Sequence, residues 1–98
     1  PVMLACAGWK DRINLEDSLL AGAIIHRIKS HFDIQCDAAL IVEQLYEATH
    51  HRLMEHMQQA SHYQRLTRHG FQQDIAYCLT IDGANVLPVY RDGAIALA

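Results

Sequence analysis

The stretch Val2-Met3-Leu4-Ala5-Cys6-Ala7-Gly8 decides the predicted fold, because it is a short apolar run that a glycine closes. Apolar residues occupy both alternating faces of this run, as is typical of a parallel strand that is covered on both sides in an α/β protein. After a polar loop, Asn14 is placed to cap a helix whose first turn holds Glu16 and Asp17. The apolar stripe of this helix predicts that it continues to about Ser30. A strand, a loop and a helix in this order form half of a βαβ unit.

Helical periodicity and turn residues predict the remaining elements. Gly70 favours the left-handed conformation that ends a helix, and Asp92-Gly93 is a typical hairpin turn. The expected elements are a long helix capped by Asp37 and running to Met57, shorter helices over Ser61–His69 and Gln72–Leu79, and a hairpin over Val86–Leu97. We therefore expect residues 1–98 to form a single α/β unit with a buried N-terminal strand, three to four helices and a C-terminal β-hairpin.

The predicted strand at residues 2–7 needs hydrogen-bonding neighbours that this chain does not supply. A terminal hairpin cannot satisfy both edges and both faces of such a strand. We therefore expect the missing strands to come from an N-terminal half of the same fold or from a second copy of the chain. The alternative is a small, helix-rich oligomerisation or interaction module without catalytic activity.

Composition excludes several classes of function. The 98 residues include 8 Lys and Arg and 11 Asp and Glu, so that the net charge of -3 disfavours nucleic-acid binding. Cys6, Cys36 and Cys78 form no C-x-x-C pair, which argues against a disulfide framework and a zinc site. Since no apolar run approaches the ~20 residues of a membrane span and no secretory signal is evident, we expect no membrane partner and a cytoplasmic setting.

The end of the predicted strand and the start of the following helix form the most informative candidate site. Ligands of α/β sheets gather at the carboxyl ends of strands and at the helix N-termini that follow them. Glu16 and Asp17 would repel a bare phosphate there, but they are suited to hold Mg²⁺, which bridges to phosphate oxygens. Alternatively, both carboxylates only stabilise the helix through their favourable interaction with the helix dipole. Asp82 precedes the predicted hairpin and is a further candidate to face a ligand.

The second predicted helix is rich in histidine and glutamate. Glu47-Ala-Thr-His50 has the Glu-x-x-His spacing of di-iron helices, but di-iron bundles need this motif twice, and no second copy occurs. We interpret the side chains of this group as a solvated polar face, the alternative being a site that stores or transfers a metal such as Zn²⁺ or Ni²⁺. They are His50, His51, His56, His62, Glu43, Glu47 and Glu55.

The order of several short motifs resembles the C-terminal part of 2-phosphosulfolactate phosphatases. These motifs are Cys6-Ala7-Gly8, Asn14-Leu15-Glu16-Asp17, Ala21-Gly22-Ala23, Gly70-Phe71, Asp74-Ile75, Tyr77-Cys78, Asp82, Val86 to Val89, and Arg91-Asp92-Gly93. The resemblance implies a three-layer α/β/α fold with a mixed sheet and a Mg²⁺-dependent phosphatase that converts 2-phosphosulfolactate to sulfolactate in coenzyme M biosynthesis.

Carried over to this sequence, the resemblance assigns roles to individual residues. Glu16 and Asp17 are the expected catalytic and metal-binding residues. Gly8, Asn14 and Asp82 are the expected residues that bind a small phosphorylated organic acid. The family's chains are much longer, so we expect this chain to be inactive alone.

Overall fold

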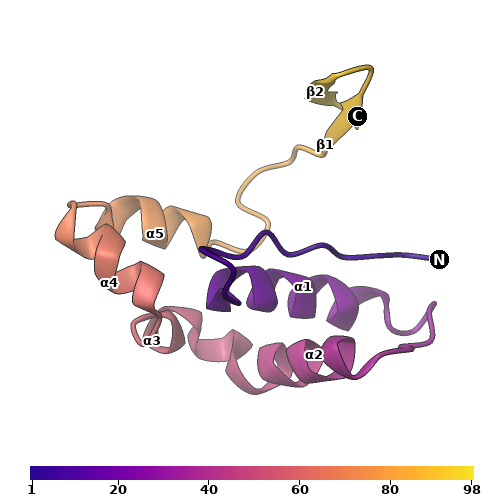
Figure 1. Cartoon of the computed structure of the whole chain (residues 1–98), viewed down its shortest axis with the longest axis horizontal. Coiled ribbons are helices and arrows are strands. Elements are labelled where there is room, and N and C mark those ends of the chain that lie inside the picture. The colour runs from indigo at the N-terminus through magenta and orange to yellow at the C-terminus, as the bar shows by residue number, and fades with distance from the viewer.

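The computed structural model describes residues 1–98 as a helical body with a small hairpin beside it (Figure 1). In chain order the elements are α1 (Leu15–Ile28), α2 (Asp37–Thr49), the 3-10 turn η1 (His50–Arg52), α3 (Leu53–Met57), α4 (Ser61–Arg68), α5 (Gln72–Cys78), β1 (Pro88–Arg91) and β2 (Ala94–Leu97). Apart from the predicted long helix from Asp37 to Met57, the helices and the hairpin occur within a few residues of their predicted bounds. None of the helices is long and apolar enough to cross a membrane.

Helices α1 and α2 lie side by side and form the largest helix pair (Figure 1). Gly22 of α1 is the point of close approach, because a Cβ atom at this position would meet the carbonyl group of Val42 and the Cβ of Tyr46 in α2. Ala21, beside it, is buried as well. The small side chains therefore let the two helix backbones approach each other.

A small hydrophobic core joins α1 to the end of α3 and the start of α4. Leu19, Met57 and Ala60 are its buried members. Half-buried apolar side chains pack around them, namely Leu15, Leu45, Leu53, Tyr63 and Leu79. No large side chain is fully buried anywhere in the chain. The core is thus shallow for a chain of this length.

The predicted second helix is interrupted. At Thr49 the backbone leaves helical geometry (φ −123°, ψ −12°), and its hydroxyl group donates a hydrogen bond to the carbonyl of Leu45 at 2.7 Å. The 3-10 turn η1 and the short helix α3 follow. Such a side-chain bond to the preceding turn competes with the helical pattern and bends helices. In addition, Cys36 rather than Asp37 takes the N-cap position of α2.

The prediction of a buried N-terminal strand is not confirmed. Residues 1–8 form no strand, and Met3 is 91% exposed. They run beside α1, where Val2 and Ile25 line one groove. The physical reason is the absence of a partner: β1 and β2 pair only with each other, so nothing in this chain satisfies the backbone of a third strand. The predicted mixed sheet and three-layer fold are likewise not confirmed, since the sheet that forms is two-stranded and antiparallel.

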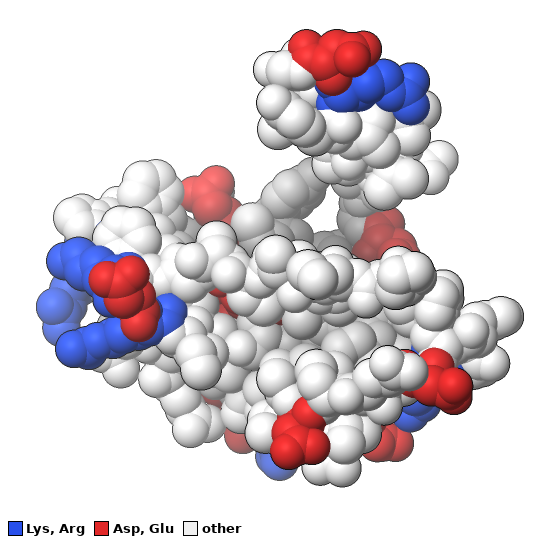
Figure 2. Space-filling view, turned by 45° about the vertical axis from the view of Figure 1, so that its right-hand side comes forward, with Lys and Arg blue, Asp and Glu red and all other residues white.

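The C-terminal hairpin confirms the predicted turn. Pro88 pairs with Leu97 and Arg91 with Ala94, while Asp92 and Gly93 have φ values of +52° and +82°. Positive φ at both positions is typical of the two-residue turns that match the twist of a hairpin. The hairpin stands apart from the helices (Figure 1), and its charged atoms lie at the outer end (Figure 2). Its apolar side chains are exposed to solvent, except for the half-buried Val89.

The chain exposes more surface than a compact protein of its mass. Its accessible surface is 7977 Å², against about 5,700 Å² for a folded monomer of 11.1 kDa. Exposed apolar residues occur in the N-terminal segment and in the hairpin, and also on the helices, for example Leu20, Ile41 and Tyr77. Most of the face shown in Figure 2 accordingly carries no charged residue.

Candidate functional site

A tight loop leads into α1 and depends on Gly8. Trp9 and Arg12 exchange two backbone hydrogen bonds of 3.0 Å, and Lys10 and Asp11 at the tip have positive φ values. Gly8 itself has φ +69°, and a Cβ atom there would lie 2.7 Å from the carbonyl oxygen of Arg12. Both the conformation and the lack of space therefore require glycine at this position.

Asp17 ties this loop to the first turn of α1. Its Oδ2 accepts a hydrogen bond of 2.7 Å from the backbone N–H of Gly8. Its backbone carbonyl accepts a longer bond of 3.6 Å from the thiol of Cys6. The motif Cys6-Ala7-Gly8 and the carboxylate of Asp17 thus form one local structure, in which Oδ1 of Asp17 makes no hydrogen bond to the protein.

Glu16 turns toward α4 instead. Its Oε1 lies 3.0 Å from Nδ1 of His62, at ion-pair distance but without the alignment of a hydrogen bond. Its Oε2 is buried and has no hydrogen-bond partner, and the same holds for Nδ1 of His62. A buried carboxylate oxygen without a hydrogen-bond partner is energetically unfavourable. Because a bound ligand would satisfy it, Oε2 of Glu16 is a candidate ligand-binding atom.

Glu16 and Asp17 line the same cavity. It has a volume of about 580 Å³ and is bounded by side chains of α1, α3, α4 and α5 and by Tyr46 of α2. Most of the lining residues are hydrophobic, and the ionisable groups include His62 and Asp74 besides the two carboxylates. Such a cavity, apolar with a few polar groups, is typical of a small-molecule site.

The other two predicted substrate-binding residues, Asn14 and Asp82, do not line this cavity. Asn14 is the N-cap residue of α1, but its side chain makes no capping bond, and its carbonyl accepts hydrogen bonds from the backbone and hydroxyl of Ser18. Asp82 follows Ile81, which lines the cavity, but its own carboxylate pairs with Arg27, with N–O distances of 2.8 and 3.1 Å. Arg27 follows Asp17 by ten residues, which is about 15 Å along the helix.

The pair of Arg27 and Asp82 is a surface ion pair. The hydrogen bond and the charge of Arg27 lower the pKa of the Asp82 carboxyl group, and Asp82 in turn raises the pKa of Arg27. Both side chains are exposed. The structure therefore gives Asp82 a surface partner and does not bring it to Glu16 and Asp17.

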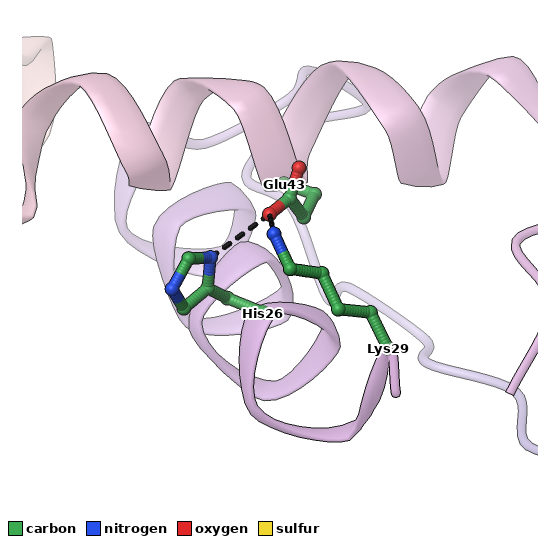
Figure 3. Close-up of polar contacts among 3 residues, drawn as sticks. All are labelled: His26, Lys29 and Glu43. Atoms are coloured by element: carbon green, nitrogen blue, oxygen red, sulfur yellow. Dashed lines mark hydrogen bonds and ion pairs between the residues drawn. The ribbon is translucent and has the colours of Figure 1, made fainter. Parts of the chain in front are cut away.

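The interpretation of Glu43 as part of a solvated face is wrong. Glu43 is only 6% exposed, and its Oε1 lies 2.7 Å from Nζ of Lys29 and 2.8 Å from Nδ1 of His26 (Figure 3). The hydrogen bond from Lys29 and then that from His26 lower the pKa of Glu43, and Glu43 raises the pKa of Lys29. The close packing at Gly22 brings this face of α2 onto α1. The periodicity of the apolar residues along the helix does not specify this contact.

Sequence reasoning also missed the role of His62, which it grouped with the solvated histidines. The structure places His62 on α4 against Glu16 and against the ring of Trp9, with ring centroids 6.2 Å apart. Arg65, three residues later on the same helix, reaches Nε2 of His62 at 3.1 Å. The i, i+3 spacing of these two residues is the only signal in the sequence, and it does not identify Glu16 as the partner.

The carboxylates suit one mode of metal binding. No group of three or more His, Cys, Asp or Glu side chains is arranged to hold a metal ion by itself, which gives the His-rich helix no support as a metal store. Mg²⁺, however, is usually bound by one or two carboxylates, with water and substrate phosphate as the other ligands. The partnerless Oε2 of Glu16 and the free Oδ1 of Asp17 fit this chemistry.

Comparison with known proteins identifies the family. Residues 1–93 match the sequence model of a phosphatase family, 2-phosphosulpholactate phosphatase, and the chain belongs to this family. The curated relatives include proteins named "Probable 2-phosphosulfolactate phosphatase" from Thermotoga maritima, with 38% identity over 98% of this chain, and from Thermotoga petrophila, with 35% identity over 98%. A protein of the same name from Caldanaerobacter subterraneus is 31% identical over 95% of the chain.

The chain is shorter than these relatives. It spans 41% of the length of the two Thermotoga proteins and 39% of the Caldanaerobacter protein. The family resemblance expected from the motifs around Gly8 and Gly22 is confirmed. The activity of the longer proteins is a separate question for this chain.

Proposed function

We propose that this chain contributes the Glu16 and Asp17 side of the active site of a Mg²⁺-dependent phosphatase. The substrate is a small phosphorylated organic acid of the 2-phosphosulfolactate type, and the products are sulfolactate and phosphate, as in coenzyme M biosynthesis. One observation carries the proposal: in a chain of this family, two adjacent carboxylates line a cavity and one buried oxygen, Oε2 of Glu16, has no partner.

Each residue of the site has a distinct role in this proposal. Asp17 fixes the loop through the N–H of Gly8, and glycine at this position allows the tight loop in which the carbonyl oxygen of Arg12 lies close by. Glu16 and the free oxygen of Asp17 are the metal ligands. Mg²⁺, when bound, offsets negative charge on the phosphoryl group. In the overall reaction, water supplies the oxygen that binds phosphorus, and the ester oxygen leaves with a proton.

The proposal includes dependence on a larger structure. The excess of about 2,300 Å² over a compact monomer is more than the ~800 Å² that each partner contributes to a protein interface of standard size. The exposed apolar residues of the N-terminal segment and the hairpin contribute to this surface. We propose that the remaining part of a family-length protein covers it, offers strand partners to residues 2–7, and adds the other ligands. On this view the chain is inactive alone.

A complementation assay tests the proposal. The chain is co-expressed with the part of the Thermotoga maritima relative that lies outside the match, and phosphate release from 2-phosphosulfolactate is measured with Mg²⁺ and with EDTA. Glu16→Gln and Asp17→Asn are each expected to lower the rate at least as strongly as the loss of a residue behind a metal ligand, about 10- to 100-fold. Glu55→Gln, an exposed carboxylate elsewhere, is the control. If Glu16→Gln and Asp17→Asn both release phosphate as fast as the control variant, the assignment of the two carboxylates is contradicted.

The excess surface also supports a second candidate function. An oligomerisation module without catalytic activity would bury the same apolar residues against another copy of the chain. Light scattering distinguishes the two, because the module predicts a stable homodimer of the 98-residue chain. The phosphatase proposal predicts instead that the co-expressed part displaces such self-association.

A further inference from the structure

A chain of contacts runs from the surface of α4 to the half-buried carboxylate of Glu16. The guanidinium carbon of Arg65 lies 4.4 Å from the centre of the Trp9 ring, within the range of a cation–π contact. Nη2 of Arg65 lies 3.1 Å from Nε2 of His62, and Nδ1 of His62 lies 3.0 Å from Oε1 of Glu16. Trp9 comes from the loop before α1, so the contacts connect that loop to α4.

The chemistry of arginine settles which nitrogen of His62 carries the proton. A guanidinium group has only N–H donors and no acceptor, and it stays charged in proteins. Nε2 of His62 must therefore accept the hydrogen bond from Arg65, which leaves the ring proton of the neutral imidazole on Nδ1. Nδ1 is the nitrogen that faces Glu16. The contact can thus become a hydrogen bond from Nδ1–H to Oε1 by a small turn of the ring.

We propose that His62 and Arg65 are positioning residues for Glu16, and that Arg65 acts by fixing the tautomer of His62. With Oε1 directed toward the imidazole, Oε2 is left for the ligand of the site. Histidine and carboxylate pairs of this kind orient metal ligands in many proteins, and the loss of such a partner costs about 10- to 100-fold in metal affinity. The inference rests on the proposed function for the metal, but the tautomer itself does not depend on it.

The tautomer is measured without metal and without activity. Long-range ¹H–¹⁵N correlation spectra of the ¹⁵N-labelled chain are recorded at a pH at which the imidazole is neutral, and the signals of His62 are identified by their absence in His62→Asn. We expect the proton of His62 on Nδ1, and we expect Arg65→Ala to shift the equilibrium toward the Nε2 form. Arg68→Ala, a matched loss of charge on the same helix, leaves it unchanged. A proton on Nε2 in the wild-type chain overturns the proposal.

Metal affinity gives the second measurement. Mn²⁺ serves as the probe, and its dissociation constant is determined by calorimetry on the chain co-expressed with the part that is proposed to add the other ligands. His62→Leu is expected to weaken binding about 10-fold or more, whereas His62→Asn, whose amide nitrogen occupies the place of Nδ1, retains most of the affinity. His69→Leu, at the exposed end of α4, is the control.

The two proposals fail in different ways. If Glu16→Gln weakens Mn²⁺ binding but His62→Leu does not, the positioning role of His62 is wrong and the metal site stands. If Glu16→Gln has no effect on Mn²⁺ binding, the metal assignment under the proposed function is wrong, whatever the tautomer of His62.

Discussion

Replacing Gly22 by alanine tests the packing of α1 against α2. A Cβ atom at this position would lie 2.8 Å from the carbonyl carbon of Val42, 2.9 Å from Cβ of Tyr46, and closer still to the carbonyl oxygen of Val42. The obstacles are backbone and a Cβ atom rather than the end of a flexible side chain. The helices must therefore move apart by roughly 1 Å, a disturbance typical of overpacked cores.

Two opposing terms set the magnitude for Gly22→Ala. Overpacking costs about 1–3 kcal/mol, and more where backbone has to move. Alanine in place of glycine inside a helix returns about 1 kcal/mol. We expect a net loss of about 1–2 kcal/mol in the free energy of unfolding, which for a domain of this size lowers Tm by roughly 5–15 °C.

Thermal unfolding followed by circular dichroism at 222 nm measures this effect. Ala23→Gly, at the next position of α1, serves as the calibration, because it carries the propensity term without the close approach. A Tm of Gly22→Ala at or above the wild-type value would refute the described packing. The change in Tm would then reflect only the higher helix propensity of alanine.

Further predictions concern the core, the ion pairs and the hairpin. Leu19→Ala, at a side chain that is 5% exposed, is expected to cost about 2–4 kcal/mol in urea unfolding, whereas Leu20→Ala, at a residue that is 64% exposed, stays within about 0.5 kcal/mol. Because the pKa of Glu43 is lowered on folding, its stabilising contribution is present above pH 4.5 and is lost as the pH falls through the folded value. The difference in Tm between wild type and Glu43→Gln should therefore be present at pH 7 and shrink in acid, and a pH-independent difference speaks against the ion pair. Asp82→Asn should change neither Mn²⁺ affinity nor Tm in 0.5 M salt, because its partner is a screened surface arginine; a weakened Mn²⁺ affinity would return Asp82 to the site. Gly93→Val should disorder the hairpin, seen as loss of cross-strand NMR contacts, since φ is +82° there, and an intact hairpin would contradict the turn geometry.

Local signals explain which elements the sequence predicted well. The acidic first turn and apolar stripe of α1 depend on residues a few positions apart, and the structure confirms a helix over Leu15–Ile28. Gly70 and the Asp92-Gly93 turn adopt the positive φ values that their residue types favour. The predicted long helix from Asp37 failed at Thr49, where one side-chain hydrogen bond outweighs a periodic pattern that continues beyond it.

For the candidate site, too, the sequence predicted the local features but not the contacts between distant parts of the chain. That Glu16 and Asp17 stand at a helix start near Gly8 follows from short spacing, and the structure confirms this placement and the bond from Gly8 to Asp17. The partner of Glu16 is on α4, far along the chain, and Arg27 of α1 holds Asp82. Pairs of this sequence separation depend on how the helices pack.

The amino-acid sequence by itself determined most of the helices, the hairpin turn and the family, because these depend on neighbouring residues and on motifs in a fixed order. Only the tertiary structure decided that Glu43 is buried, that His62 faces Glu16, and that residues 2–7 remain unpaired. Periodicity defines the faces of a helix or strand, but it does not specify which surface each face meets. That choice is made by close approaches such as the one at Gly22 and by the strand partners that are present.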